Sequence, residues 1–168
     1  LASRKNLCVN EAVLRESGHG TVDSRCQSLT ASWMREHSDN ESQKCEFYEN
    51  FEAVLSGSTT VRLPTGIYTL DDLKEYGKVH RVCPYFLARH AMNHVDVIIY
   101  SYYYLLDQKV SDLVSRHLPK DAVIVFDEAH NIDNVCIESL SVDLTKSVVE
   151  SASRSLVSLQ EHVLAVKQ

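Results

Sequence analysis

The sequence predicts an α/β fold, and two apolar runs together with several helical patterns indicate it. The run 122–126 is strand-length and unbroken, and Asp127 and Glu128 follow it directly. Such a run is typical of a strand buried on both faces, with its carboxyl end at the edge where open α/β sheets bind ligands. A second apolar run, 97–100, lies within the segment 95–100, which predicts another buried strand of the same sheet.

The other elements follow in chain order from local patterns. Apolar spacing predicts helices over 23–37, 70–76, 104–117 and 142–166. Cys83-Pro84 is typical of a helix start, and the helix is expected to continue over 85–92. The polar or Gly/Ser/Thr-rich segments 39–43 and 55–64 predict loops.

The acid pair after the strand indicates nucleotide hydrolysis. In P-loop ATPases the first acid at this place holds Mg²⁺, usually through water, and the second orients or deprotonates the attacking water. We assign these roles to Asp127 and Glu128, and to His130 a coupling role that relays the state of the phosphate to a second domain. The alternative is a solvated acidic turn. The apolar run before the pair and Ala-His after it favour the ATPase interpretation.

A phosphate-binding loop is the missing partner of this motif. The five glycines, at 18, 20, 57, 66 and 77, are never followed by Lys-Ser or Lys-Thr, so no P-loop pattern occurs. An acid pair without a P-loop cannot hydrolyse ATP alone. We therefore expect the chain to be a piece of a longer helicase or ATPase whose P-loop lies upstream.

Composition is that of an ordinary domain or two small modules. The 168 residues are 44% hydrophobic and 24% charged, with a formal net charge of −6. We expect neither a membrane span nor a secretory signal, because no apolar stretch is long enough. The acidic balance counts against a dedicated nucleic-acid module, although a local basic track remains compatible with it.

Cysteine usage carries a second signal. The odd number of cysteines argues against a disulfide framework, and no Cys-x-x-Cys pair indicates a zinc ribbon. Four widely spaced thiolates can ligate an iron–sulfur cluster, and four buried structural cysteines are the equal alternative on spacing alone. Cations within three residues favour the thiolate form at the four that precede the acid motif: Cys8, Cys26, Cys45 and Cys83.

Four segments together resemble the XPD family of superfamily-two, DEAH-box DNA helicases: 3–8, 83–89, 100–107 and 125–136. The resemblance runs from residue 1 to about 145 and is most specific in the last segment. It implies an iron–sulfur domain over 1–90, part of a RecA-like motor domain 1 over 91–135, and the start of a helical arch over 136–168. It further implies that Cys8, Cys26, Cys45 and Cys83 hold a [4Fe–4S] cluster, that Asp127 binds Mg²⁺, and that Cys136 is not a ligand.

The resemblance implies an ATP-dependent 5′→3′ helicase that acts, as a TFIIH subunit, in nucleotide excision repair and transcription initiation in the nucleus. Its partners would be single-stranded or forked DNA and other TFIIH subunits, including the kinase module through the arch. The fragment alone should be inactive. A metal-stabilised interaction module without catalysis is the alternative function.

A possible DNA track lies beside the ligands, where cations and aromatic rings combine. This combination follows a phosphate backbone and stacks unpaired bases. The candidates are Arg4, Lys5, Tyr85 and Arg89. For Arg4 and Arg89, support of the cluster is the competing role, and for Tyr85 it is packing in the core.

Overall fold

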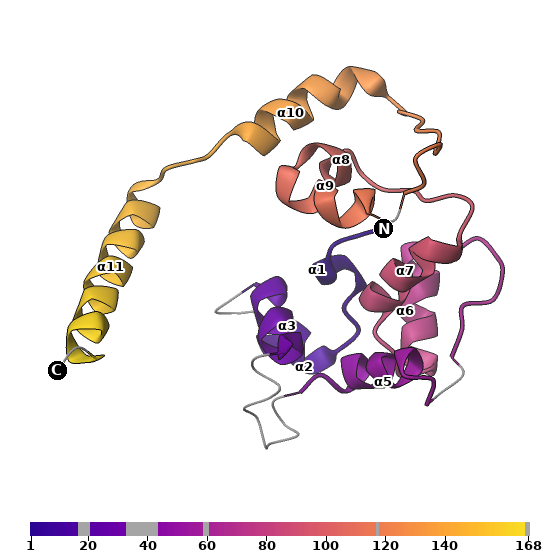
Figure 1. The fold of residues 1–168 in the computed structure, drawn as a ribbon, viewed down its shortest axis with the longest axis horizontal. Coiled ribbons are helices and arrows are strands. Elements are labelled where there is room, and N and C mark those ends of the chain that lie inside the picture. Colours follow the sequence, from indigo (N-terminus) through magenta and orange to yellow (C-terminus); the bar gives the residue numbers. More distant parts are fainter. Residues whose placement is uncertain (17–20, 33–43, 59–60, 117, 167–168) are drawn as a thin grey trace.

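The computed structural model describes residues 1–16, 21–32, 44–58, 61–116 and 118–166. Every regular element in these ranges is helical. In Figure 1 the helices from α1 to α7 form one body, α8 and α9 lie beside it, and α10 leads away to the separate helix α11. Their bounds are α1 Arg4–Leu7, α2 Glu11–Glu16, α3 Val22–Thr30, α5 Glu46–Leu55, α6 Leu70–Val79, α7 Pro84–Ala91, α8 Tyr103–Leu106, α9 Gln108–Ser115, α10 Ile132–Leu140 and α11 Lys146–Val166, with short 3₁₀ turns at Met92–His94 and Ala129–Asn131.

Two apolar clusters form the core of the first body, and α5 joins them. The larger one gathers buried side chains of α1, α5, α6 and α7, among them Leu7 and Leu87. The smaller one gathers Val13 and Leu29 of α2 and α3. Phe47 and Tyr48 of α5 pack against both clusters. The first body is therefore one folded unit, built from short helices that could not be stable alone.

Helix ends follow the expected chemistry where the sequence contains capping residues. Thr69 and Asp72 form a reciprocal capping box at the start of α6, which extends three residues beyond the predicted 70–76. Pro84 occupies the first helical position of α7, as predicted. Helix α3 covers the first part of the predicted 23–37, whose remainder after residue 32 lies outside the described residues, as does the predicted loop 39–43.

The predicted helix 104–117 is interrupted. Asp107 is extended between α8 and α9, and its carboxylate accepts the backbone N–H of Val110 at 3.2 Å. A short acidic side chain of this kind caps a helix start and so begins a new helix. The predicted helix 142–166 begins instead at Lys146, because the hydroxyl of Thr145 accepts the N–H of Val148.

The predicted strands 95–100 and 122–126 form no sheet within the described residues, which corrects the α/β prediction for this chain. Both segments are extended or irregular, and the side chains of Val123 and Val125 are 88% and 84% exposed. A strand buried on both faces needs neighbouring strands for its hydrogen bonds and helices over its faces. The described residues supply neither.

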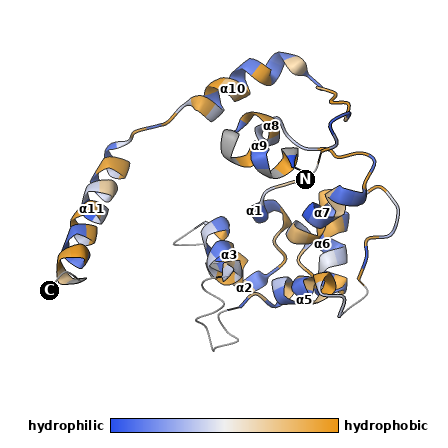
Figure 2. Ribbon diagram, in the orientation of Figure 1, coloured by the Kyte–Doolittle hydropathy of each residue, from blue (hydrophilic) through white to orange (hydrophobic). Residues whose placement is uncertain are grey.

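The apolar surface of the structure is concentrated at its carboxyl-terminal end. Figure 2 shows hydrophobic residues recurring along α10, which packs in part against α8, and along the separate helix α11. Ile137, Leu140 and Leu156 are between 66% and 82% exposed. Among the described residues no helix has the length and apolar character that crossing a bilayer requires.

Candidate metal centre

Four cysteines from four different helical segments surround one small cavity of the first body. Cys8 ends α1, Cys26 lies within α3, Cys45 precedes α5, and Cys83 precedes α7. The cavity is also lined by Val9, Val13, Phe47, Tyr48 and Tyr85, so its walls are mostly apolar. The structure thus brings together the four predicted ligands, which are separated by up to 75 residues along the sequence.

Two of the thiols lie at helix starts, where the chain geometry suits a thiolate. Cys45 and Cys83 each hold the cap position, with extended backbone, immediately before the first helical residue. The nearby backbone N–H groups of Phe86 and Tyr85 lower the pKa of the Cys83 thiol in part. Helix starts carry unpaired N–H groups and partial positive charge, which favour a negative sulfur.

Side-chain donors reach two of the sulfurs. The Arg4 guanidinium donates to Cys26 Sγ at 3.5 Å, and the Asn10 amide donates to Cys45 Sγ at 3.4 Å. Arg4 is a predicted site residue, whereas the sequence analysis missed Asn10. The oxygen of Asn10 accepts the N–H of Ala12 at 3.0 Å and caps α2. An Asn just before a helical pattern predicts a helix cap, but nothing in the local sequence predicts its hydrogen bond to a distant sulfur.

Burial dominates the acid–base state of the thiols. It raises the pKa of Cys8 and Cys26, and it raises that of Cys83 to about 12. The Arg4 charge and hydrogen bond lower the pKa of Cys26 only in part. The expectation that nearby cations would by themselves favour thiolates is therefore wrong for these three, because desolvation outweighs them. The positive charge of a bound metal would have to lower the thiol pKa values enough to form thiolates.

The four sulfurs line one cavity from different sides. Within the described ranges, no three cysteine, histidine or acidic side chains form a group that could hold one metal ion. A cubane cluster instead takes one thiolate at each of its four irons, so its ligands stand around it rather than converge on a point. Four thiols lining one cavity fit that donor set. Cys136 lies outside the cavity, on α10, and is half-buried.

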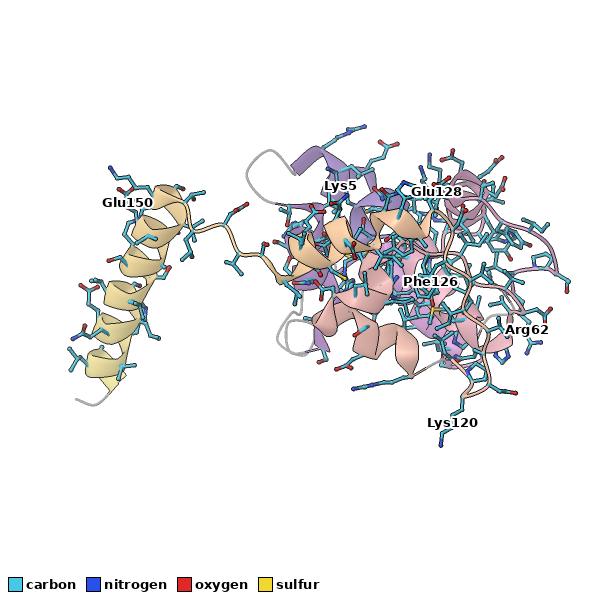
Figure 3. The ribbon with its side chains drawn as sticks, turned by 90° about the horizontal axis from the view of Figure 1, so that it is seen from above. Lys5, Arg62, Lys120, Phe126, Glu128 and Glu150 are labelled. Atoms are coloured by element: carbon cyan, nitrogen blue, oxygen red, sulfur yellow. The ribbon has the colours of Figure 1, made fainter. Side chains whose placement is uncertain are left out.

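The predicted DNA residues have unequal exposure. Tyr85 is buried, and two guanidinium groups lie over its ring: Arg4 at 4.6 Å and Arg89 at 3.8 Å from the centroid. Arg89 Nη1 is buried and has no hydrogen-bond partner. Lys5 is exposed, and Figure 3 shows its side chain at the surface. Of the four, Lys5 has the exposure that phosphate contact requires.

The acid motif forms a turn on the surface. Glu128 has left-handed backbone with a φ of 51°, and its carboxylate lies 3.2 Å from Nδ1 of His130. Asp127 accepts the Tyr102 hydroxyl at its backbone oxygen, and the rings of Tyr102 and Phe126 stack with centroids 5.9 Å apart. The Glu128 carboxylate thus contacts the His130 ring, and both side chains face solvent.

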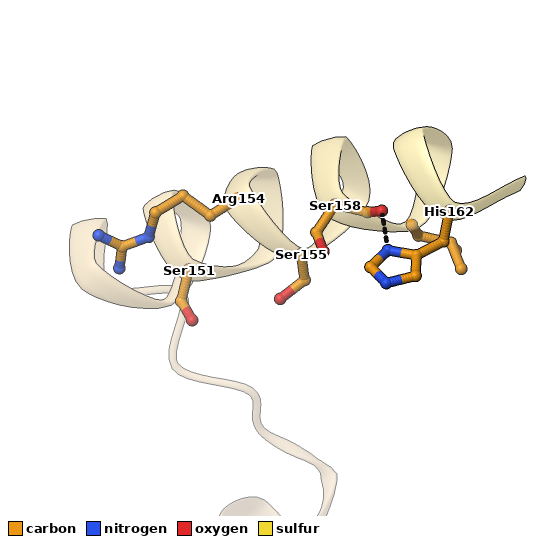
Figure 4. Close-up of a pocket in the computed structure, with 6 residues that line it drawn as sticks. Ser151, Arg154, Ser155, Ser158 and His162 are labelled. Carbon is orange, nitrogen blue, oxygen red and sulfur yellow. Dashed lines mark hydrogen bonds between the residues drawn. The ribbon is translucent and has the colours of Figure 1, made fainter. Parts of the chain in front are cut away.

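A shallow hollow along α11 is lined by the side chains of a single helix. Figure 4 shows that Ser151, Arg154, Ser155, Ser158 and His162 line it, and that all of them come from the one helix. The ring of His162 hydrogen-bonds at Nδ1 to the backbone oxygen of Ser158, four residues earlier, at 2.8 Å. This surface is the polar side of an exposed helix, so the thiol-lined cavity is the candidate site.

Comparison with known proteins agrees with this picture. The model of the family described as DEAD_2 matches residues 1–149. The chain is 51% identical over its whole length to the General transcription and DNA repair factor IIH helicase subunit XPD of Schizosaccharomyces pombe, covering 22% of that protein. It is 48% identical to the Arabidopsis thaliana protein of the same description, over 97% of this chain and 21% of that protein.

A more distant relative carries a different description. The chain is 34% identical over its whole length to the Regulator of telomere elongation helicase 1 of Rattus norvegicus, covering 12% of it. The chain spans about a fifth of the length of the XPD relatives. With four thiols around one cavity, an Asp-Glu-Ala-His turn and a family match over most of its length, the chain belongs to the DEAD_2 family of XPD-type helicases.

Proposed function

We propose that this chain is the iron–sulfur domain, part of motor domain 1 and the start of the arch of an ATP-dependent 5′→3′ DNA helicase. The helicase would act as a TFIIH subunit in nucleotide excision repair and transcription initiation in the nucleus. The observation that carries the proposal is the assembly of Cys8, Cys26, Cys45 and Cys83 around one cavity. The descriptions of the XPD relatives support the biological setting.

In this proposal the four thiolates hold a [4Fe–4S] cluster, which when bound supplies a rigid cross-link between four chain segments. The hydrogen bonds that Arg4 and Asn10 give to sulfur atoms suit negatively charged ligands. The apolar walls exclude water from the site. The raised pKa values imply that loading releases protons, because thiols that are neutral without metal must bind it as thiolates.

The motor part of the proposal rests on the acid turn. Asp127 would hold Mg²⁺ with ATP as the substrate, and Glu128 would position and deprotonate the attacking water. The contact between Glu128 and His130 supports a coupling role for the histidine, since its ring can follow any movement of the catalytic carboxylate. The P-loop would come from sequence outside these 168 residues, so the fragment alone should not hydrolyse ATP.

DNA would approach the surface that bears Lys5. Arg4 and Arg89 sandwich the ring of Tyr85, and this stack supports a structural task for all three beside the cluster. Arg89 Nη1, buried without a partner, is a donor that could bond to a phosphate oxygen after a local rearrangement. Single-stranded or forked DNA is the proposed ligand of this face.

The alternative is a metal-stabilised interaction module without catalysis of its own. Its support is the apolar side of α11, where Val149, Leu156, Leu159 and Val163 recur at helical spacing and are 45% to 66% exposed. An uncovered stripe of this kind is typical of a helix that packs against another surface. Other TFIIH subunits, including the kinase module, would dock on the arch in either case.

Metal analysis of anaerobically purified full-length protein tests the cluster. We expect iron and sulfide near four each per chain, together with visible absorption. Cys83→Ser should lose the cluster, because it removes a buried ligand, whereas Cys136→Ser should keep it. Stoichiometric zinc without sulfide would overturn the assignment. Equal loss from both substitutions would mean that the four ligands are wrongly chosen.

A further inference from the structure

The turn that leads into Cys83 has an unusual residue at its centre. Helix α6 ends in two bonds, from the N–H of Arg81 to the oxygen of Lys78 at 3.3 Å and from the N–H of Val82 to the oxygen of Gly77 at 2.9 Å. This pair of bonds is the Schellman motif, in which the residue at the place of Arg81 adopts left-handed backbone and is usually glycine. Arg81 has a φ of 53°.

A large side chain in left-handed backbone is strained, and such strain persists only where the surroundings hold it. Two residues of α5 hold Arg81. Its guanidinium pairs with the Glu46 carboxylate, and its backbone oxygen accepts the Asn50 amide at 2.8 Å. We call these three residues, Glu46, Asn50 and Arg81, the α5 latch.

The residues of the α5 latch are close in sequence to two of the cavity thiols. Glu46 directly follows Cys45, and Arg81 lies two residues before Cys83. A further bond closes the same strip of backbone, since the N–H of Cys83 donates to the oxygen of Phe47 at 2.8 Å. The segment that begins at Cys45 and the segment that ends at Cys83 are therefore joined by three contacts. These are the backbone bond between Cys83 and Phe47 and the two contacts that Arg81 makes with α5.

We propose that Arg81 is a positioning residue for the candidate cluster: through Glu46 and Asn50 it fixes the start of α7 against the start of α5, and so sets the Cys45 and Cys83 thiols at the separation that the cluster needs. The proposal rests on the proposed function for its ligand. It differs from a simple helix cap, because a cap stabilises α6 and does not select between thiols. The latch acts on two of the four.

Site-resolved alkylation of the cluster-free full-length protein tests the selectivity. We expect Arg81→Ala to raise the iodoacetamide reaction rate at Cys45 and Cys83 about two- to fivefold, the range of an exposed ion pair, without changing Cys8 and Cys26. Asn50→Asp should raise it about tenfold at the same two cysteines, because it turns a donor into an acceptor facing a carbonyl oxygen. Mass spectrometry reports each cysteine separately.

Matched variants separate the latch from general destabilisation. Arg15→Ala removes an exposed ion pair with Glu11 that lies within one helix, and it should leave all four rates unchanged. Arg81→Lys keeps the charge and should retain most of the protection. If Glu46 and Arg81 act through one contact, the double alanine variant should react no faster than the faster single variant. Equal acceleration at all four cysteines would overturn the proposal.

The loaded protein supplies a second measurement. Bleaching of the cluster by an iron chelator should be about two- to fivefold faster in Arg81→Ala than in wild type or Arg15→Ala. Identical bleaching rates would refute the latch even though a cluster is present. If the wild type contains no iron or sulfide while Cys45 and Cys83 still become selectively reactive, the proposed cluster fails and the latch stands.

Discussion

Residues 1–91 and residues 95–166 of this chain differ in how far their apolar side chains are buried. The first region buries Leu7, Phe51 and Leu87 between short helices. The second leaves Ile99, Leu140 and Leu144 at least 77% exposed. An amphipathic pattern therefore tells which face of an element seeks burial, and it does not tell whether the covering surface belongs to the same stretch of chain. The first region has a core of its own, whereas the second buries Tyr104 and Val114 but leaves most of its apolar faces exposed.

The largest effect should separate the catalytic turn of the second region from the cluster of the first. In full-length protein, Glu128→Gln should lower DNA-stimulated ATP hydrolysis by about 10²- to 10⁴-fold, because the amide cannot accept a proton. ATP binding and iron content should stay near the wild-type level. Phosphate release and metal analysis measure the two properties on the same sample.

Glu138→Gln is the matched control for this substitution. It makes the same chemical change on an exposed position of α10, ten residues further along the chain, and should keep normal turnover. Normal turnover in Glu128→Gln would instead mean that the acid pair is only a solvated turn. Loss of iron in that variant would mean that the two regions are not separable.

A substitution inside the closed region should reduce stability sharply. A Cβ on Gly77 would lie 2.8 Å from two ring carbons of Pro84 and from the oxygen of Val82. Neither can move without shifting Cys83, so we expect Gly77→Ala to lower the free energy of unfolding by about 1–3 kcal/mol, as overpacking does. Urea denaturation and cluster absorbance would measure it.

Gly66 provides the comparison for this prediction. The atoms nearest to a Cβ there belong to the Tyr68 side chain and lie at 3.6 Å or more, which is ordinary contact. Gly66→Ala should therefore change the stability by less than about 0.5 kcal/mol. Similar losses from both substitutions would show that the α6–α7 contact is not specially tight.

Alkaline pH should loosen the first region when the cluster is absent. Burial raises the pKa of Cys83 from 9.0 to about 12, so the folded state keeps a proton that the unfolded state releases. This contribution to stability is complete below pH 9 and is lost as the pH rises toward 12. By pH 11 the loss should be about 3 kcal/mol.

Denaturant titrations of the cluster-free protein between pH 8 and 11 measure this slope. Cys83→Ser should flatten it, because serine does not titrate in this range. The loaded protein should behave oppositely and lose its cluster on acidification, since protons compete with iron for the thiolates. An unchanged slope in Cys83→Ser would assign the pH dependence to other groups.

The smallest expected effect distinguishes surface cations from those of the site. Lys5→Glu should weaken single-stranded DNA binding by about tenfold or less and flatten its salt dependence, with cluster absorbance intact. Arg4→Glu should reduce the absorbance itself, because the Arg4 side chain contacts Cys26 Sγ and the ring of Tyr85. Fluorescence anisotropy across a salt series, with absorbance recorded for each sample, compares the two variants. Loss of the cluster in the Lys5→Glu variant would contradict this distinction between surface cations and cations of the site.

Local chemistry made part of the fold predictable. Helices α6 and α7 could be predicted because Thr69 with Asp72 and Pro84 mark their starts. The interruption at Asp107 could have been predicted from the same capping chemistry, but the apolar spacing on either side concealed it. The strands 95–100 and 122–126 could not be tested by local pattern at all, because pairing depends on neighbours elsewhere in a chain.

The site was predictable in its ligands and not in their surroundings. Four cysteines can be read from the sequence and matched to a family, and they do line one cavity. Asn10, Gly77 and Arg81 act through contacts with residues that are between five and 35 positions away in the sequence. Such partners depend on the packing of α5 and α7, and no spacing rule links them. The buried position of Tyr85 likewise follows from packing with two arginines.

Because the four cysteines are far apart in the sequence, they are synthesised at different times. A ribosome adds about 5–20 residues per second, so about 4–15 seconds separate the synthesis of Cys8 from that of Cys83. During that interval the cavity cannot close, because its last wall is the start of α7. The earlier thiols are therefore exposed to oxidants, and to whatever machinery delivers iron and sulfide, before the fold can shelter them.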